Sequence, residues 1–206
     1  IILAYALDSR KPHTLDAFTG KILDYDGKEY KEYKGVKYTD IEGSYAKMQI
    51  NVLAESGILP EVTEFRPKDV IVQKEFLSIL SKTLNYYGVV ITENSTQQEI
   101  DNLYAYLVRE GIIKQDEIAP NAPVTREEGV KYIIRAMKFD KVADLRELYK
   151  ESTFADRDQI TPNLEPYVCL ATGLKIINGY NKTFSPRAGL TREAAAVMIY
   201  NYLMVT

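Results

Sequence analysis

The same set of landmark residues recurs three times, in the same order, along this chain of 206 residues. Each copy has an Asp or Asn, a glycine 17 positions later, an aromatic or aliphatic residue, a proline two residues after it, and a further aliphatic. The copies are Asp40, Gly57, Phe65, Pro67 and Ile71; Asn94, Gly111, Ile118, Pro120 and Val124; and Asp156, Gly173, Phe184, Pro186 and Leu190. Ordered landmarks of this kind indicate tandem copies of one supersecondary unit.

Each copy predicts two helices joined by a loop. In the first copy Tyr45, Met48 and Val52 share one helical face, and Gly57 supplies a left-handed stop. The second helix of that copy is expected from about 73 to 84. The same pattern predicts helices near 97–110 and 126–138, then near 163–172 and 192–204, and the stretch 139–151 also has helical periodicity. One such unit cannot bury its apolar faces alone, so we expect a mainly α pseudo-threefold bundle of three helix–loop–helix repeats.

The first 36 residues have a different pattern. Thr19-Gly20 and Asp26-Gly27 are turn signals between short β-like runs, which predicts a short N-terminal β-hairpin segment. The phrase "LDAFTGKIL" resembles the last hairpin of PepSY-like domains, where a similar "DA.TG" phrase recurs. The chain starts "IILAYALDSR", without Met or signal peptide, which favours a piece of a longer protein. The expected segments are 1–36 (remnant of a preceding domain), 37–90 (repeat one), 91–150 (repeat two) and 151–206 (repeat three).

Composition argues against several function classes. A net charge of −3 disfavours nucleic acid as a partner, and no apolar run approaches the roughly 18 residues of a membrane-spanning helix. His13 is the single histidine, and we expect neither a zinc cluster nor a Ser-His-Asp arrangement within this chain. Cys169 lies in an apolar helical stretch and is expected to be a core residue. We therefore expect no enzymatic activity, no metal and no cofactor.

The second helix of each repeat begins with a recognisable cap. Thr125 and Thr191 occupy the N-cap position, where a hydroxyl accepts from first-turn amides. Thr125 with Glu128 predicts a full capping box, whereas Ala194 replaces the glutamate in the third repeat. In the first repeat the cap is lost at Val72 while the glutamate is kept.

Arg126 and Arg192 follow these caps, and Gln73 takes the same position in the first repeat. A cation in the first turn opposes the helix dipole by about 0.3–1 kcal/mol. Two interpretations are open. Each arginine pairs with a nearby carboxylate, or each arginine combines with free helix amides to form a receptor for a carboxylate or phosphate.

The stretches "YTDIEGSYAKMQINVLAESGIL", "APNAPVTREEGVKYII" and "FSPRAGLTREAAAVMI" resemble tandem S-layer homology repeats, whose signature joins an "F.P" loop to "ITRAE". The resemblance covers residues 37–206. It implies a non-catalytic anchor outside the cell, on the surface of Gram-positive or related bacteria. Its expected partner is a secondary cell-wall polysaccharide attached to peptidoglycan, often pyruvylated and bound in grooves between adjacent repeats. Neighbouring S-layer proteins are further expected partners.

The resemblance also implies ligand-binding residues. The arginine of the signature is the family's main ligand contact, which carries over to Arg126 and Arg192 only. Tyr45 holds the position of the expected aromatic residue, since Trp is absent from the chain. The remaining candidates are the two caps, the two acidic landmarks, and a loop whose tyrosine would form a sugar platform: Thr125, Thr191, Asp40, Asp156, Asn178, Gly179 and Tyr180. For the acidic landmarks helix capping is the alternative, and for the loop a plain polar connection.

A second function class stays open beside the anchor. The three repeats could instead form a scaffold for protein partners, in which both arginines are purely structural. On the anchor hypothesis, Arg126 and Arg192 are expected to contribute comparably to binding, and Gln73 is expected to contribute little.

Overall fold

The computed structural model describes residues 4–6, 14–23, 27–29, 35–84, 86–145 and 152–205. The chain divides into two compact units, Ile1–Lys34 and Gly35–Thr206. The first unit holds an antiparallel sheet in the order β1 (Ala4–Ala6), β2 (Thr14–Asp16) and β3 (Ile22–Leu23). Gly20, with a φ of 67°, lies in the turn between β2 and β3, as the Thr-Gly signal predicted. Of the second turn signal, Asp26 lies outside the described residues.

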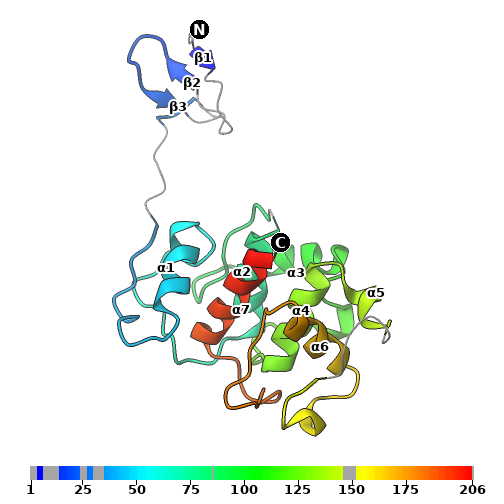
Figure 1. Ribbon diagram of the computed structural model, residues 1–206. Coiled ribbons are helices and arrows are strands. Elements are labelled where there is room, and N and C mark those ends of the chain that lie inside the picture. Colours follow the sequence, from blue (N-terminus) through cyan, green and yellow to red (C-terminus); the bar gives the residue numbers. More distant parts are fainter. Residues whose placement is uncertain are drawn as a thin grey trace. The chain divides into compact units, whose positions relative to one another are not determined.

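The second unit is helical (Figure 1). Its helices are α1 (Lys47–Glu55), α2 (Gln73–Lys82), α3 (Gln97–Arg109), α4 (Arg126–Ala136), α5 (Asp140–Ala143), α6 (Glu165–Gly173) and α7 (Arg192–Val205). Two short 3-10 turns, η1 (Gln115–Glu117) and η3 (Arg157–Gln159), lie between them. The pairs α1/α2, α3/α4 and α6/α7 are the three repeats. The expected fold class, mainly α with a short N-terminal β segment, is confirmed.

The repeats interlock rather than stack as separate hairpins. The first helix of each repeat packs on the second helix of another: α1 on α7, α3 on α2, and α6 on α4. The second helices also meet one another, α2 and α7 each packing on α4. A repeat taken alone would therefore expose the apolar faces of both its helices.

Three backbone hydrogen bonds close a ring around the centre of this unit. Ile71 N–H donates to the Leu190 carbonyl (2.9 Å), Leu190 N–H to the Val124 carbonyl (2.8 Å), and Val124 N–H to the Ile71 carbonyl (3.0 Å). These are the three aliphatic landmarks of the sequence. A closed ring of equivalent bonds requires the three repeats to surround one axis, which confirms the pseudo-threefold arrangement.

Six further bonds extend this ring. The first two amides of each second helix donate to carbonyls in the proline loop of another repeat, at 2.9–3.0 Å. The donors and acceptors are Gln73 and Lys74 on Ala122 and Pro120; Arg126 and Glu127 on Ala188 and Pro186; and Arg192 and Glu193 on Asp69 and Pro67. We call these nine bonds the collar. The expectation of free amides beside the arginines is wrong, because those amides already bind carbonyls.

Three local expectations also need correction. The apolar face expected for α1 is wrong, because Tyr45, Met48 and Val52 are exposed, whereas the buried residues of α1 are Ile50, Leu53 and Ala54. The helix expected over 139–151 is seen only as α5, after which Asp144 and Leu145 leave the helix, and 146–151 lie outside the described residues. Leu145 is half exposed, so its place in the apolar pattern is not used for packing. In the third repeat Gly173 is still helical, and the left-handed position falls on Lys175, with a φ of 60°. Gly57 and Gly111 do adopt the left-handed conformation.

The centre of the bundle is packed asymmetrically. Phe76, Gly129 and Ala195 occupy equivalent positions on α2, α4 and α7. A Cβ on Gly129 would lie 2.8 Å from Leu190 Cδ2 and 3.6 Å from Phe76 Cζ. The fully buried Phe76 ring therefore lies close against a position where the neighbouring helix has no side chain.

We expect Phe76→Ala to lower the free energy of unfolding by about 3–5 kcal/mol, because no neighbouring side chain can fill the space it leaves. Urea denaturation followed by circular dichroism measures this change. Tyr87→Ala, at a side chain that is 97% exposed, is the control and should change stability by less than about 0.5 kcal/mol. Equal stability of the two variants would contradict this description of the core.

Candidate functional site

One groove of about 750 Å³ is formed by all three repeats. The first repeat contributes Tyr45, the second contributes Arg126, and the third forms the remaining wall. We call it the open groove. Its lining from the third repeat is Ile176, Ile177, Asn178, Gly179, Tyr180, Thr183, Phe184, Ser185, Ala194, Val197, Met198 and Asn201. It contains one arginine and no Asp or Glu.

Arg126 is oriented by the third repeat. Its Nε donates to the Phe184 carbonyl (2.8 Å), and its guanidinium lies 5.2 Å from the centroid of the Phe184 ring. Within the described parts of the chain it forms no ion pair with a carboxylate. Burial lowers the pKa of Arg126, while the nearby Tyr45 and Asp156 oppose that effect. A half-buried guanidinium with unused N–H donors is suited to an anionic ligand.

Arg192 is presented in the same way in a smaller groove of about 360 Å³. Its Nε donates to the Phe65 carbonyl (2.7 Å) and its guanidinium lies 5.5 Å from the centroid of the Phe65 ring. Here, however, its Nη1 also binds the Glu75 carboxylate, and both side chains are buried. Glu75 is the third residue of α2. The equivalent residue of α7, which faces the open groove with Arg126, is Ala194.

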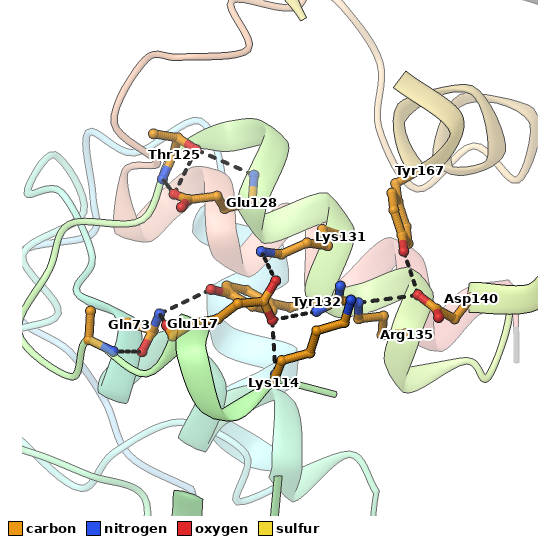
Figure 2. A network of polar contacts seen from close by, with 11 residues as sticks. Gln73, Lys114, Glu117, Thr125, Glu128, Lys131, Tyr132, Arg135, Asp140 and Tyr167 are labelled. Atoms are coloured by element: carbon orange, nitrogen blue, oxygen red, sulfur yellow. Dashed lines mark hydrogen bonds and ion pairs between the residues drawn. The ribbon is translucent and has the colours of Figure 1, made fainter. Parts of the chain in front are cut away.

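The interface between the first and second repeats, which we call the third interface, has Gln73 in place of the arginine. Gln73 Nε2 donates to the Tyr132 hydroxyl and to the Glu117 carbonyl (both 3.0 Å), as Figure 2 shows for Tyr132. Its Oε1 accepts from the Tyr104 hydroxyl and the Ala119 amide (both 2.8 Å). The Gln73 side chain is therefore fully used within the protein.

A charged network lines the rest of this interface (Figure 2), where Glu117, Lys131 and Arg135 border a groove of about 600 Å³. Glu117 accepts from Lys131 Nζ (2.9 Å), Arg135 Nη1 (2.6 Å) and the Lys114 amide (2.9 Å). Burial raises the pKa of Glu117, but the Lys114 amide and the two cations outweigh it and lower the pKa to about 2. Lys131 and Arg135 correspond on α4 to Val197 and Asn201 of α7, which line the open groove, so this interface carries charges at two positions where the open groove has none.

The two threonines serve as caps. Thr125 Oγ1 accepts from the Glu128 amide (3.4 Å), and the Glu128 carboxylate accepts from the Thr125 amide (2.8 Å), which confirms the predicted capping box. Thr191 Oγ1 accepts from the Ala194 amide (3.3 Å). Both hydroxyls thus satisfy helix amides that the collar leaves unpaired.

The acidic landmarks hold the proline loops. Asp40 accepts from the Phe65 and Arg66 amides (2.8 and 2.7 Å), and Asp156 accepts from the Phe184 and Ser185 amides (2.9 and 2.6 Å). Burial raises the pKa of Asp156, and the two amides outweigh this effect and lower it. These loops supply the carbonyls that orient both arginines, so the two aspartates act on the arginines through the loop backbone.

The structure brings five of the expected site residues into one groove: Tyr45, Arg126, Asn178, Gly179 and Tyr180. Arg192 lines the smaller groove. Sequence reasoning missed the α7 wall formed by Val197, Met198 and Asn201, and it missed the Glu75–Arg192 pair. The exchange of glutamate for Ala194 is visible in the sequence, but the arginine that it faces belongs to another repeat.

The described residues include no group of three or more His, Cys, Asp or Glu that could hold a metal ion. Across the same residues, no helix has both the length and the apolarity needed to cross a membrane.

Comparison with known proteins gives a family match. The family model for the S-layer homology domain matches residues 105–128 and 153–196, in the second and third repeats. An amylopullulanase of Thermoanaerobacterium thermosulfurigenes is 28% identical over 92% of this chain and 11% of its own length. The exoglucanase XynX of Acetivibrio thermocellus is 29% identical over 82% of this chain and 16% of its own. A surface-layer 125 kDa protein of Lysinibacillus sphaericus is 26% identical over 75% of this chain and 14% of its own. The chain thus spans only a small part of each relative.

The low pKa of Glu117 predicts an acid-sensitive contribution to stability. A carboxyl whose pKa falls from 4.5 to about 2 on folding stabilises the protein above pH 4.5, and this contribution is lost as the pH falls toward 2. We expect Glu117→Gln to cost about 2–3 kcal/mol at neutral pH and to converge with the parent near pH 2. Thermal unfolding across this range measures both effects. Glu61→Gln, at an exposed glutamate, is the control, and a Glu117→Gln curve parallel to the parent's would contradict the assignment.

Proposed function

We propose a ligand for the open groove, from the premise that residues 105–128 and 153–196 match the S-layer homology domain, a non-catalytic kind of domain that anchors proteins to the cell wall. The groove binds an anionic segment of a secondary cell-wall polysaccharide attached to peptidoglycan. The observation that carries this proposal is Arg126, a half-buried cation that has no carboxylate partner among the described residues. A desolvated charge without a counter-ion favours an anionic ligand.

The chemistry of the groove fits an acidic sugar. A carboxylate, such as that of a pyruvate ketal, would accept from the free edge of the Arg126 guanidinium in a charge-assisted contact worth about 1.5–3 kcal/mol. Tyr45 and Tyr180 are 66% and 80% exposed, so their rings are available to pack on sugar faces. Asn178 and Asn201 supply amides for hydroxyl groups.

The remaining wall is apolar, as in many small-ligand sites. Val197 and Met198 lie on α7 where the third interface has Lys131 and Tyr132. Gly179 allows the loop to pass close to its neighbours, since a Cβ there would lie 2.6 Å from both Phe154 Cε1 and the Thr183 carbonyl oxygen. The module performs no chemistry of its own in this proposal, acts outside the cell, and has neighbouring S-layer proteins as further partners.

We expect Arg126→Gln to impair wall binding and Arg192→Gln to impair stability. Arg126→Gln should weaken wall binding by about 10- to 100-fold with little change in stability, because it removes the ligand's counter-charge. Arg192→Gln should lower stability by about 3 kcal/mol or more, because it leaves Glu75 buried without its partner, and folded protein should bind like the parent. Co-sedimentation with purified sacculi of Thermoanaerobacterium thermosulfurigenes or Lysinibacillus sphaericus, together with thermal unfolding, measures both.

Two controls complete this test. Sacculi stripped of the secondary polymer with acid should no longer bind the parent. Arg109→Gln, at an exposed arginine on α3, removes the same charge away from the groove and should bind normally. Unchanged sedimentation of folded Arg126→Gln, or of the parent with stripped sacculi, would favour the protein scaffold instead.

A further inference from the structure

The two arginine grooves hold their arginine in the same way and differ in the residue next to the guanidinium. In each, an aspartate holds the loop amides, the loop carbonyl accepts from the arginine Nε, and the guanidinium lies over a phenylalanine ring. The difference is the third residue of the next second helix, which is Glu75 beside Arg192 and Ala194 beside Arg126.

We propose that Glu75 is a resident carboxylate that occupies the anion-binding position of the smaller groove, so that this chain has one working polysaccharide site. This inference rests on the proposed function of the open groove. Glu75 binds the Nη1 edge of Arg192, whereas in the open groove the residue equivalent to Glu75 is Ala194, which lines the groove with Arg126. The protein's own carboxylate thus stands where the ligand's carboxylate would bind.

An external anion competes poorly with this internal one. Glu75 is fixed on α2 next to Arg192, so its effective concentration is far above that of a polymer carboxylate. Displacing it would also leave a carboxylate that is only 8% exposed without a partner. Glu64 and Glu93 line the same groove, and Glu93 is paired with Arg66 (2.7 Å). The smaller groove therefore carries more negative than positive side chains and repels an anion.

The third residue of each second helix determines which grooves can bind the polysaccharide. In the second repeat it is Glu128, which is engaged in the capping box with Thr125, and the facing side chain is the saturated Gln73. Only the third repeat has a side chain here, Ala194, that can neither pair with an arginine nor cap. The prediction is that exchanging these residues moves the binding site from one groove to the other.

A set of combined substitutions tests this with the same sacculi. Arg126→Gln alone should lose binding by about tenfold or more. Adding Glu75→Ala to it should restore binding by about tenfold, because Arg192 becomes available, and adding Arg192→Gln as a third change should abolish it again. Restored binding that persists after Arg192→Gln, or no restoration in a folded Glu75→Ala/Arg126→Gln protein, overturns the inference.

The reciprocal substitution keeps the test independent of any folding defect. Thr191→Val/Ala194→Glu reproduces Val72 and Glu75 of α2, so the new carboxylate is not held in a capping box and can pair with Arg126. This variant should lose binding as Arg126→Gln does, whereas Thr191→Val alone is the control and should bind normally. If Glu75→Ala unfolds the protein, the double substitution is the deciding test, and normal binding by folded Thr191→Val/Ala194→Glu overturns the inference. Parent binding that never depended on Arg126 would instead overturn the proposed function, and the inference with it.

Discussion

The nine backbone hydrogen bonds of the collar are the interaction on which the rest of the helical unit depends. They use the amides that open every second helix and the carbonyls of every proline loop, always between different repeats. Buried amides and carbonyls without partners are costly, so one repeat or two would leave part of this set unsatisfied. The first helix of each repeat packs on the second helix of another, α1 on α7, α3 on α2 and α6 on α4. Burial of the apolar helix faces therefore also requires all three repeats. Three repeats are thus the smallest number that satisfies all nine hydrogen bonds of the collar.

The collar also decides how this fold can recognise an anion. Helix N-termini commonly bind anions through free amides, but here the first two amides of each second helix donate to carbonyls, and the third amide donates to a threonine hydroxyl in two repeats. Recognition therefore passes to the side chain at the first helical position. Because the loop that closes the collar also offers the carbonyl to that side chain, the Arg126 guanidinium is oriented by the same contact that joins the second and third repeats.

Most of the fold could be predicted from the sequence because its signals are local and repeated. The caps, the proline loops and the helix positions each depend on spacings within a few residues, and six of the seven helices lie where these signals predict. The face expected for α1 is the exception, since Tyr45, Met48 and Val52 are exposed. The site could be predicted only in part. Glu75 and Arg192 are 117 positions apart, and no spacing within a repeat indicates that they meet. Lys175 was missed because a glycine two residues earlier suggested the helix end, although the backbone bond from Ile176 to Ala171 fixes it later.

The first repeat shows why these positions can change without loss of the fold. It lacks the threonine cap and the arginine, having Val72 and Gln73 instead, yet its backbone makes every bond that the collar requires. Since the collar uses only main-chain atoms, the side chains at the start of each second helix are free to take other partners. Gln73 has become part of a saturated polar interface and Glu75 has become the partner of Arg192. The same backbone plan therefore supports one open groove, one groove whose arginine is paired with Glu75, and one groove lined by a charged network.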